Sequence, residues 1–121
     1  MKPTILIVDD DKTTCKGLER LLSDDYVTYK AFNGMEAIDT YNQHGEEIDI
    51  ILCDIVMPIM EGTEMIERIR AENKNVVIIV MTALYSSDKV HDAIAKGAND
   101  YLIKPLDIPE LETILRNSLA N

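Results

Sequence analysis

Apolar runs of strand length alternate with amphipathic stretches along the whole chain. Each run is too short for a helix, and each precedes a segment whose apolar residues recur at helical spacing. The predicted strands are 4–8, 26–31, 48–53, 76–81 and 101–103. The predicted helices are 12–23, 35–43, 63–72, 87–96 and 108–119. This alternation predicts five β-α units in an α/β fold.

Two of the predicted strands are apolar on both faces, which indicates how the sheet is covered. The runs Ile5-Leu6-Ile7-Val8 and Ile50-Ile51-Leu52-Cys53 contain no charged position. Such strands lie in parallel sheets with helices on both faces, joined by right-handed crossovers. We therefore predict a five-stranded parallel sheet in the order 2-1-3-4-5, doubly wound and flavodoxin-like, with five helices. The length predicts one domain over residues 1–121.

The composition limits the classes of partner. The chain is 46% hydrophobic and 28% charged, and 22 acidic against 12 basic residues give a net charge of −10. Because no Lys/Arg patch is visible, we expect neither direct nucleic-acid binding nor binding to an anionic membrane. No signal peptide and no apolar run of roughly 18 residues is visible, which favours a cytoplasmic protein. Cys15 and Cys53 are expected to be reduced structural thiols.

Carboxylates follow two of the apolar runs. Asp9, Asp10 and Asp11 come directly after the first run, and Asp54 comes after Cys53. The carboxyl ends of parallel strands meet at one edge of a sheet, where ligands bind. Carboxylates gathered there repel one another, and a bound hard cation such as Mg²⁺ would offset the repulsion. For Asp11 we expect only a helix cap.

Two further polar side chains belong to the same edge. Thr82 follows the run 76–81, and Lys104 follows the run 101–103. In the predicted order, the Lys104 side chain can cross most of the about 10 Å that separate its strand from the strand of Asp54. Phosphoryl transfer needs an oxygen nucleophile, a metal, a cation and hydrogen-bond donors. The Asp54 carboxylate is the candidate nucleophile, and its attack on phosphorus would form an aspartyl phosphate.

Four motifs follow one another along the chain: Ile5-Leu6-Ile7-Val8-Asp9-Asp10, Asp54 with Met57-Pro58-Ile59-Met60-Glu61-Gly62, Met81-Thr82-Ala83, and Gly97-Ala98-Asn99-Asp100-Tyr101-Leu102-Ile103-Lys104-Pro105. Together they resemble the receiver domain of bacterial two-component response regulators, over essentially all 121 residues. Any one of them occurs by chance. All four in order, each at a strand end, are typical of that family.

The resemblance implies a role for each matched residue. Asp54 would be the phosphoacceptor, and Asp9, Asp10, Asp54 and the Val56 carbonyl would hold Mg²⁺, with Mn²⁺ as a substitute. Thr82, Ala83 and Lys104 would contact the phosphoryl group. Thr82 and Tyr101 would form the switch, although a half-buried strand tyrosine needs no such role. The bond before Pro105 would be cis.

The resemblance also implies a signalling function. The chain would accept a phosphoryl group from a histidine kinase or phosphotransfer protein and promote its own phosphorylation and dephosphorylation, without turnover of a separate substrate. The face formed by the fourth helix, fifth strand and fifth helix, around Lys89, Asp92, Tyr101 and Arg116, would control an output domain, a partner or a homodimer. Leu106 stands where winged-helix regulators have Phe, which puts their dimer in doubt.

Two alternative functions use similar parts. A phosphatase of the haloacid-dehalogenase type would need an acid two residues after its nucleophile, where Asp54 is followed by Val56. A flavin-binding flavodoxin would need a turn rich in Ser, Thr or Gly after the first strand, where the aspartates would repel phosphate.

Two apolar side chains bear on the lifetime of the phosphoryl group. Val56 lies two positions after Asp54, and Leu84 lies two positions after Thr82. Neither side chain can hydrogen-bond to the attacking water, which predicts a slowly hydrolysed phosphoryl group.

Overall fold

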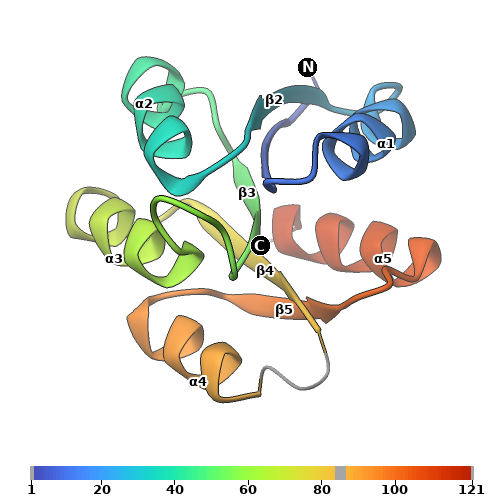
Figure 1. The fold of residues 1–121 in the computed structure, drawn as a ribbon. Coiled ribbons are helices and arrows are strands. Elements are labelled where there is room, and N and C mark those ends of the chain that lie inside the picture. The colour runs from blue at the N-terminus through green and yellow to red at the C-terminus, as the bar shows by residue number, and fades with distance from the viewer. Residues whose placement is uncertain (1, 84–86, 121) are drawn as a thin grey trace.

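The five predicted strands form one parallel sheet in the predicted order, β2-β1-β3-β4-β5 (Figure 1). The computed structural model describes residues 2–83 and 87–120. The strands are β1 Thr4–Val8, β2 Val27–Ala31, β3 Ile50–Asp54, β4 Val77–Thr82 and β5 Asp100–Ile103. The helices are α1 Lys12–Leu22, α2 Gly34–His44, α3 Gly62–Glu72, α4 Ser87–Lys96 and α5 Ile108–Leu119. The prediction of a doubly wound α/β fold is confirmed.

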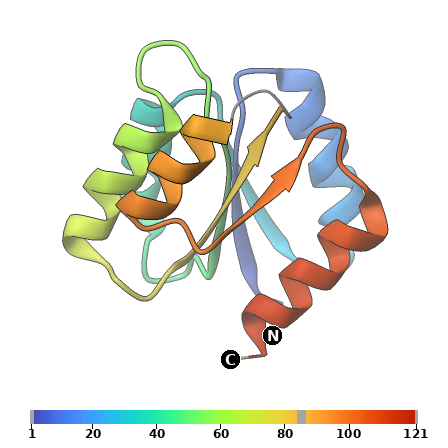
Figure 2. The same ribbon diagram turned by 90° about the horizontal axis from the view of Figure 1, so that it is seen from below.

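Helices cover both faces of the sheet (Figure 2), so nearly all residues of the inner strands β1, β3 and β4 are buried in one of two cores. Helices α2, α3 and α4 lie on one face, and α1 and α5 on the other. Leu6 and Val8 of β1 pack in the first core, whereas Ile5 and Ile7 pack in the second. Alternation of side chains between two cores explains why the whole run is apolar. Burial of each of these side chains stabilises the fold by roughly 1.5–3 kcal/mol.

Half of the predicted boundaries match the structure, and the others differ by one or two residues. Asp54 and Thr82 were expected just beyond their strands, but they are the last residues of β3 and β4, because they still pair with Met81 and Ile103. One packing prediction is wrong. The helical spacing of Cys15, Leu18, Leu21 and Leu22 predicts that all four lie on the buried face of α1. Leu21 is instead 38% exposed, since the other three side chains fill that face.

Two local predictions are confirmed. Asp11 is the N-cap of α1, and its carboxylate accepts hydrogen bonds from the backbone N–H groups of Thr13 and Thr14. Cys15 and Cys53 are buried free thiols. Burial is the largest cause that raises the pKa of Cys15 to about 11, so this thiol stays protonated at neutral pH.

The loop between β3 and α3 contains a strained residue close to Asp54. Ile59 has a φ of 70° and is 78% exposed. The Met60 N–H donates to the Pro58 carbonyl at 2.7 Å, so the chain turns tightly around Ile59. The left-handed region is costly for a β-branched residue. Strain is therefore stored in the loop that follows Asp54.

Relief of this strain should stabilise the protein. Ile59→Asn is expected to raise the free energy of unfolding by about 1 kcal/mol, because Asn tolerates the left-handed region and the exposed side chain buries little surface. Urea unfolding would measure the change. Ile59→Ala is the matched control, since it shortens the same side chain but keeps the Cβ atom. Equal stability of the two variants would contradict the prediction.

Candidate functional site

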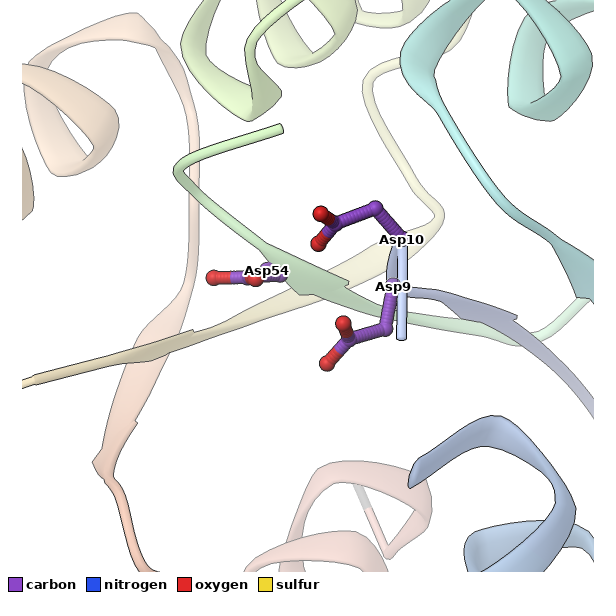
Figure 3. Close-up of side chains that lie close together, drawn as sticks. All are labelled: Asp9, Asp10 and Asp54. Carbon is purple, nitrogen blue, oxygen red and sulfur yellow. The ribbon is translucent and has the colours of Figure 1, made fainter. Parts of the chain in front are cut away.

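Three carboxylates converge at the carboxyl edge of the sheet (Figure 3). Asp9 and Asp10 follow β1, and Asp54 ends β3. One oxygen from each of the three side chains lies within 4.8 Å of the others. Asp9 is buried, Asp54 is half-buried and Asp10 is exposed. The predicted gathering of these carboxylates is confirmed, and the exposed Asp10 leaves the cluster open to solvent on one side.

Both carboxylate oxygens of Asp9 already have partners. Oδ1 accepts a hydrogen bond from the Asp11 N–H at 2.9 Å. Oδ2 accepts one from Lys104 Nζ at 3.0 Å. The Asp9 N–H donates to the Ala31 carbonyl at 3.1 Å, and the Cys15 thiol donates to the Asp9 carbonyl at 3.3 Å. Asp9 is thus a fixed anchor for the Lys104 ammonium, whereas Asp10 and Asp54 have more room for a ligand.

Lys104 reaches the cluster from the end of β5, as its length predicted. Its ammonium lies 3.4 Å from Asp54 Oδ2 while it also contacts Asp9. Burial disfavours the charged ammonium, but the hydrogen bond that Lys104 donates to Asp9 and the charges of Asp54 and Asp9 together outweigh it and raise the pKa of Lys104. The Lys104-Pro105 bond is cis, as predicted.

The charge on Asp54 is held in an unfavourable environment. Burial is the largest cause that raises the pKa of this carboxyl above its usual value, and the charge of Asp9 adds to it. The Lys104 ammonium and the Val56 N–H act in the opposite direction. The net rise means that the carboxylates are not fully compensated by the protein's own cations and donors.

The donor set fits a hard divalent cation. All three candidate ligand groups offer oxygen, they converge within 4.8 Å, and Asp54 carries charge that needs compensation. Mg²⁺ prefers oxygen ligands and keeps several waters, so few protein ligands suffice. The Val56 carbonyl as a further ligand stays a prediction.

The predicted residues Thr82, Ala83 and Tyr101 line one hollow. Thr82 is buried, and its hydroxyl donates to the Ala83 carbonyl at 3.3 Å. Tyr101 is 45% exposed. Both line a hollow of about 540 Å³ between α4 and β5. The structure therefore brings Thr82 and Tyr101 to one hollow, with the Tyr101 side chain largely at the surface. Leu84 lies outside the described residues.

Two contacts near the site were not predicted. Lys89 of α4 pairs with Glu61 of the β3–α3 loop at 3.1 Å. The Lys12 ammonium lies 5.1 Å from the centroid of the Phe32 ring. The sequence holds one signal for the second contact. Lys12 directly follows the aspartates and begins a helix, a position where acidic residues are usual.

Known proteins resemble this chain in both sequence and fold. Residues 5–116 match the family model of the response regulator receiver domain. Transcriptional regulatory protein ZraR of Klebsiella oxytoca is 39% identical over 118 residues, which are 97% of this chain and 26% of that protein. Sporulation initiation phosphotransferase F of Bacillus subtilis (strain 168) is 32% identical over 124 residues, which cover 98% of this chain and 95% of that protein.

Among solved structures, a two-component response regulator from Clostridium difficile matches with a TM-score of 0.92 and 28% identity, over 99% of this chain and 98% of that chain. The chain spans about a quarter of the length of the ZraR proteins that it matches. No helix among the described residues is long and apolar enough to cross a membrane.

Proposed function

This chain belongs to the response regulator receiver domain family, a phosphorylation-dependent signalling module of two-component systems, and from that premise we propose that Asp54 is its phosphoacceptor. Three observations support the choice of Asp54. It ends the central strand β3, its carboxylate lies 3.4 Å from Lys104 Nζ, and it shares the cluster with Asp9 and Asp10. Because the chain belongs to this family, we set aside the two alternative functions, a phosphatase and a flavodoxin.

The single observation that carries the proposal is the convergence of the three carboxylates with Lys104 at one sheet edge. Intact-mass measurement after incubation with acetyl phosphate and Mg²⁺ tests it, with Asp54→Asn as the comparison. A covalent adduct that forms equally on both proteins would assign the acceptor elsewhere.

In the proposed reaction, one Asp54 oxygen attacks phosphorus while the bond from phosphorus to the donor atom breaks and its electron pair leaves with the donor. Asp10, Asp54 and the Val56 carbonyl would hold Mg²⁺ directly, and Asp9 would hold it through water. When bound, Mg²⁺ neutralises charge on the transferring group. Lys104 would pair with a phosphoryl oxygen, and the Thr82 hydroxyl and Ala83 N–H would donate hydrogen bonds to it.

Receiver domains interact with histidine kinases or phosphotransfer proteins and with output domains. For this chain we infer a protein phosphodonor of that kind, and an output domain, a partner or a second copy that responds to phosphorylation. The chain would promote its own phosphorylation and dephosphorylation without turnover of another substrate. Its net charge of −10 supports a function without direct nucleic-acid or membrane contact.

The switch would connect Asp54 to the face formed by α4, β5 and α5. If Thr82 turns toward a phosphoryl group on Asp54, it leaves space in the hollow that Tyr101 also lines. Tyr101, at 45% exposure, has room to move inward. The phosphoryl group biases two existing states through its different contacts in each.

The switch predicts where backbone signals change. Addition of phosphodonor and Mg²⁺ should shift amide resonances around Lys89, Asp92, Tyr101 and Arg116, as well as those at the site. Tyr101→Ala should keep the shifts near Asp54 and reduce the shifts on α4. Shifts confined to α1 and α2 would rule out this face as the readout.

The lifetime of the phosphoryl group should depend on Val56. This side chain is 51% exposed, lies two residues after Asp54 and cannot hydrogen-bond to water. Val56→Asn is expected to hasten hydrolysis several-fold, because an amide can orient the attacking water. Decay would be followed by intact mass after removal of the donor. Val56→Leu is the matched control and should decay at about the wild-type rate. Equal decay of Val56→Asn and wild type would exclude the idea.

A further inference from the structure

A second cation lies beside the acidic site, and none of the roles proposed above uses it. Lys12 is the first residue of α1, two positions after Asp10. Its ammonium lies 5.1 Å from the centroid of the Phe32 ring. Phe32 directly follows Ala31, whose carbonyl accepts the Asp9 N–H at 3.1 Å. The ring therefore holds the ammonium next to the turn that carries the carboxylates.

Lys12 is poorly placed for the stability of its own helix. The N-terminus of a helix carries partial positive charge, which disfavours a cation. The first turns of α2, α3, α4 and α5 each contain an acidic residue, whereas that of α1 contains none. Within residues 2–83 and 87–120, Lys12 takes part in no ion pair. Its positive charge is therefore not neutralised by a partner carboxylate.

An unpaired positive charge at the rim of the site would attract an anionic phosphodonor. The chain carries a net charge of −10, and the Lys104 ammonium is already engaged by Asp9 and Asp54 at 3.0 and 3.4 Å. A metal ion compensates the cluster itself but not the surrounding negative field. A cation at the rim that is not paired raises the local concentration of anions and speeds their association.

We propose that Lys12 is a positioning residue that draws an anionic phosphodonor to the site, without contact to the reacting atoms. The proposal rests on the function proposed for Asp54. It differs from the role of Lys104, which acts on the phosphoryl group itself.

The test is the second-order rate constant for modification by acetyl phosphate at saturating Mg²⁺, followed by intact mass. Lys12→Glu should lower it roughly three-fold near 0.1 M salt, which is the effect of a change of two charge units on a doubly charged donor at a separation of about one Debye length. The difference should widen near 0.01 M salt and vanish near 1 M, where charges are screened. Lys12→Arg should keep the wild-type rate, since Arg keeps the charge and also stacks on rings.

Lys16→Glu is the matched control. Lys16 is exposed and lies one helical turn farther along α1, so this variant has the same net charge but the change is farther from the site. Its rate constant should stay closer to the wild-type value. Phosphoramidate, a donor with less negative charge than acetyl phosphate, should show a smaller effect of Lys12→Glu.

Two results would overturn the proposal. One is an equal rate constant for Lys12→Glu and Lys16→Glu at every salt concentration. The other is a deficit of Lys12→Glu that does not depend on salt, which would point to a structural role of the Phe32 contact. Failure of the function proposed for Asp54 looks different, because the wild type itself would then gain no adduct.

Discussion

Incubation of the wild-type chain with acetyl phosphate and Mg²⁺ is expected to add one phosphoryl group, and the same treatment of Asp54→Asn is expected to add none. The physical reason is that an amide is a far weaker nucleophile than a carboxylate and cannot form the acyl phosphate. The neighbouring Asp9 carboxylate cannot replace it, because Asp9 is buried and both of its oxygens accept hydrogen bonds. The change should be from nearly complete to undetectable modification.

A matched control separates the loss of the acceptor from the loss of charge. Asp39→Asn removes one carboxylate from an exposed position on α2 and should be modified like the wild type. The adduct on the wild type should be removed by hydroxylamine, as expected for an acyl phosphate. Modification of Asp54→Asn, or an adduct that resists hydroxylamine, would refute the assignment of Asp54.

Mg²⁺ should stabilise the wild-type protein, and Asp10→Asn should abolish most of that effect. A ligand that binds only the folded state stabilises it by about 1.4 kcal/mol at a tenfold excess over its Kd. Binding also relieves the crowding of three carboxylates whose ligand oxygens lie within 4.8 Å. Asp10 is the exposed member of the cluster, so its loss removes a ligand without leaving a buried charge unpaired.

Thermal unfolding with and without millimolar Mg²⁺ measures this effect, with NaCl added to equal ionic strength. We expect a rise of several degrees for the wild type and a shift close to zero for Asp10→Asn. Asp39→Asn, which has the same net charge as Asp10→Asn, should keep the full response. A wild type that does not respond, or an Asp10→Asn variant that responds fully, would argue against a metal site formed by these residues.

Much of the fold could be predicted because local patterns and tertiary packing agree. The run Ile5-Leu6-Ile7-Val8 is apolar at every position because two helical layers cover the sheet, and that same apolar run indicates a strand buried on both faces. Asp54 and Lys104 could be assigned to one edge because parallel strands all end there. The cis bond before Pro105 was implied by the family resemblance rather than by the residues alone.

Tertiary structure alone decided how these groups pair. Lys104 and Asp9 are 95 positions apart in the sequence. The Lys104 ammonium lies nearer to Asp9 Oδ2, at 3.0 Å, than to Asp54 Oδ2, at 3.4 Å, and this difference depends on how β1 and β5 are placed in the sheet. Leu21 is exposed because other apolar residues of α1 already fill the core beneath it.

The left-handed φ of Ile59 follows from the path of the loop between β3 and α3, which overrides the residue's own preference. The position of Lys12 over Phe32 likewise depends on how two loops meet. The sequence by itself thus determined which elements form and which side chains reach the sheet edge, since those follow from periodicity and strand direction. The partners of each charge were decided by packing between distant segments, because contact geometry depends on positions that no local pattern encodes.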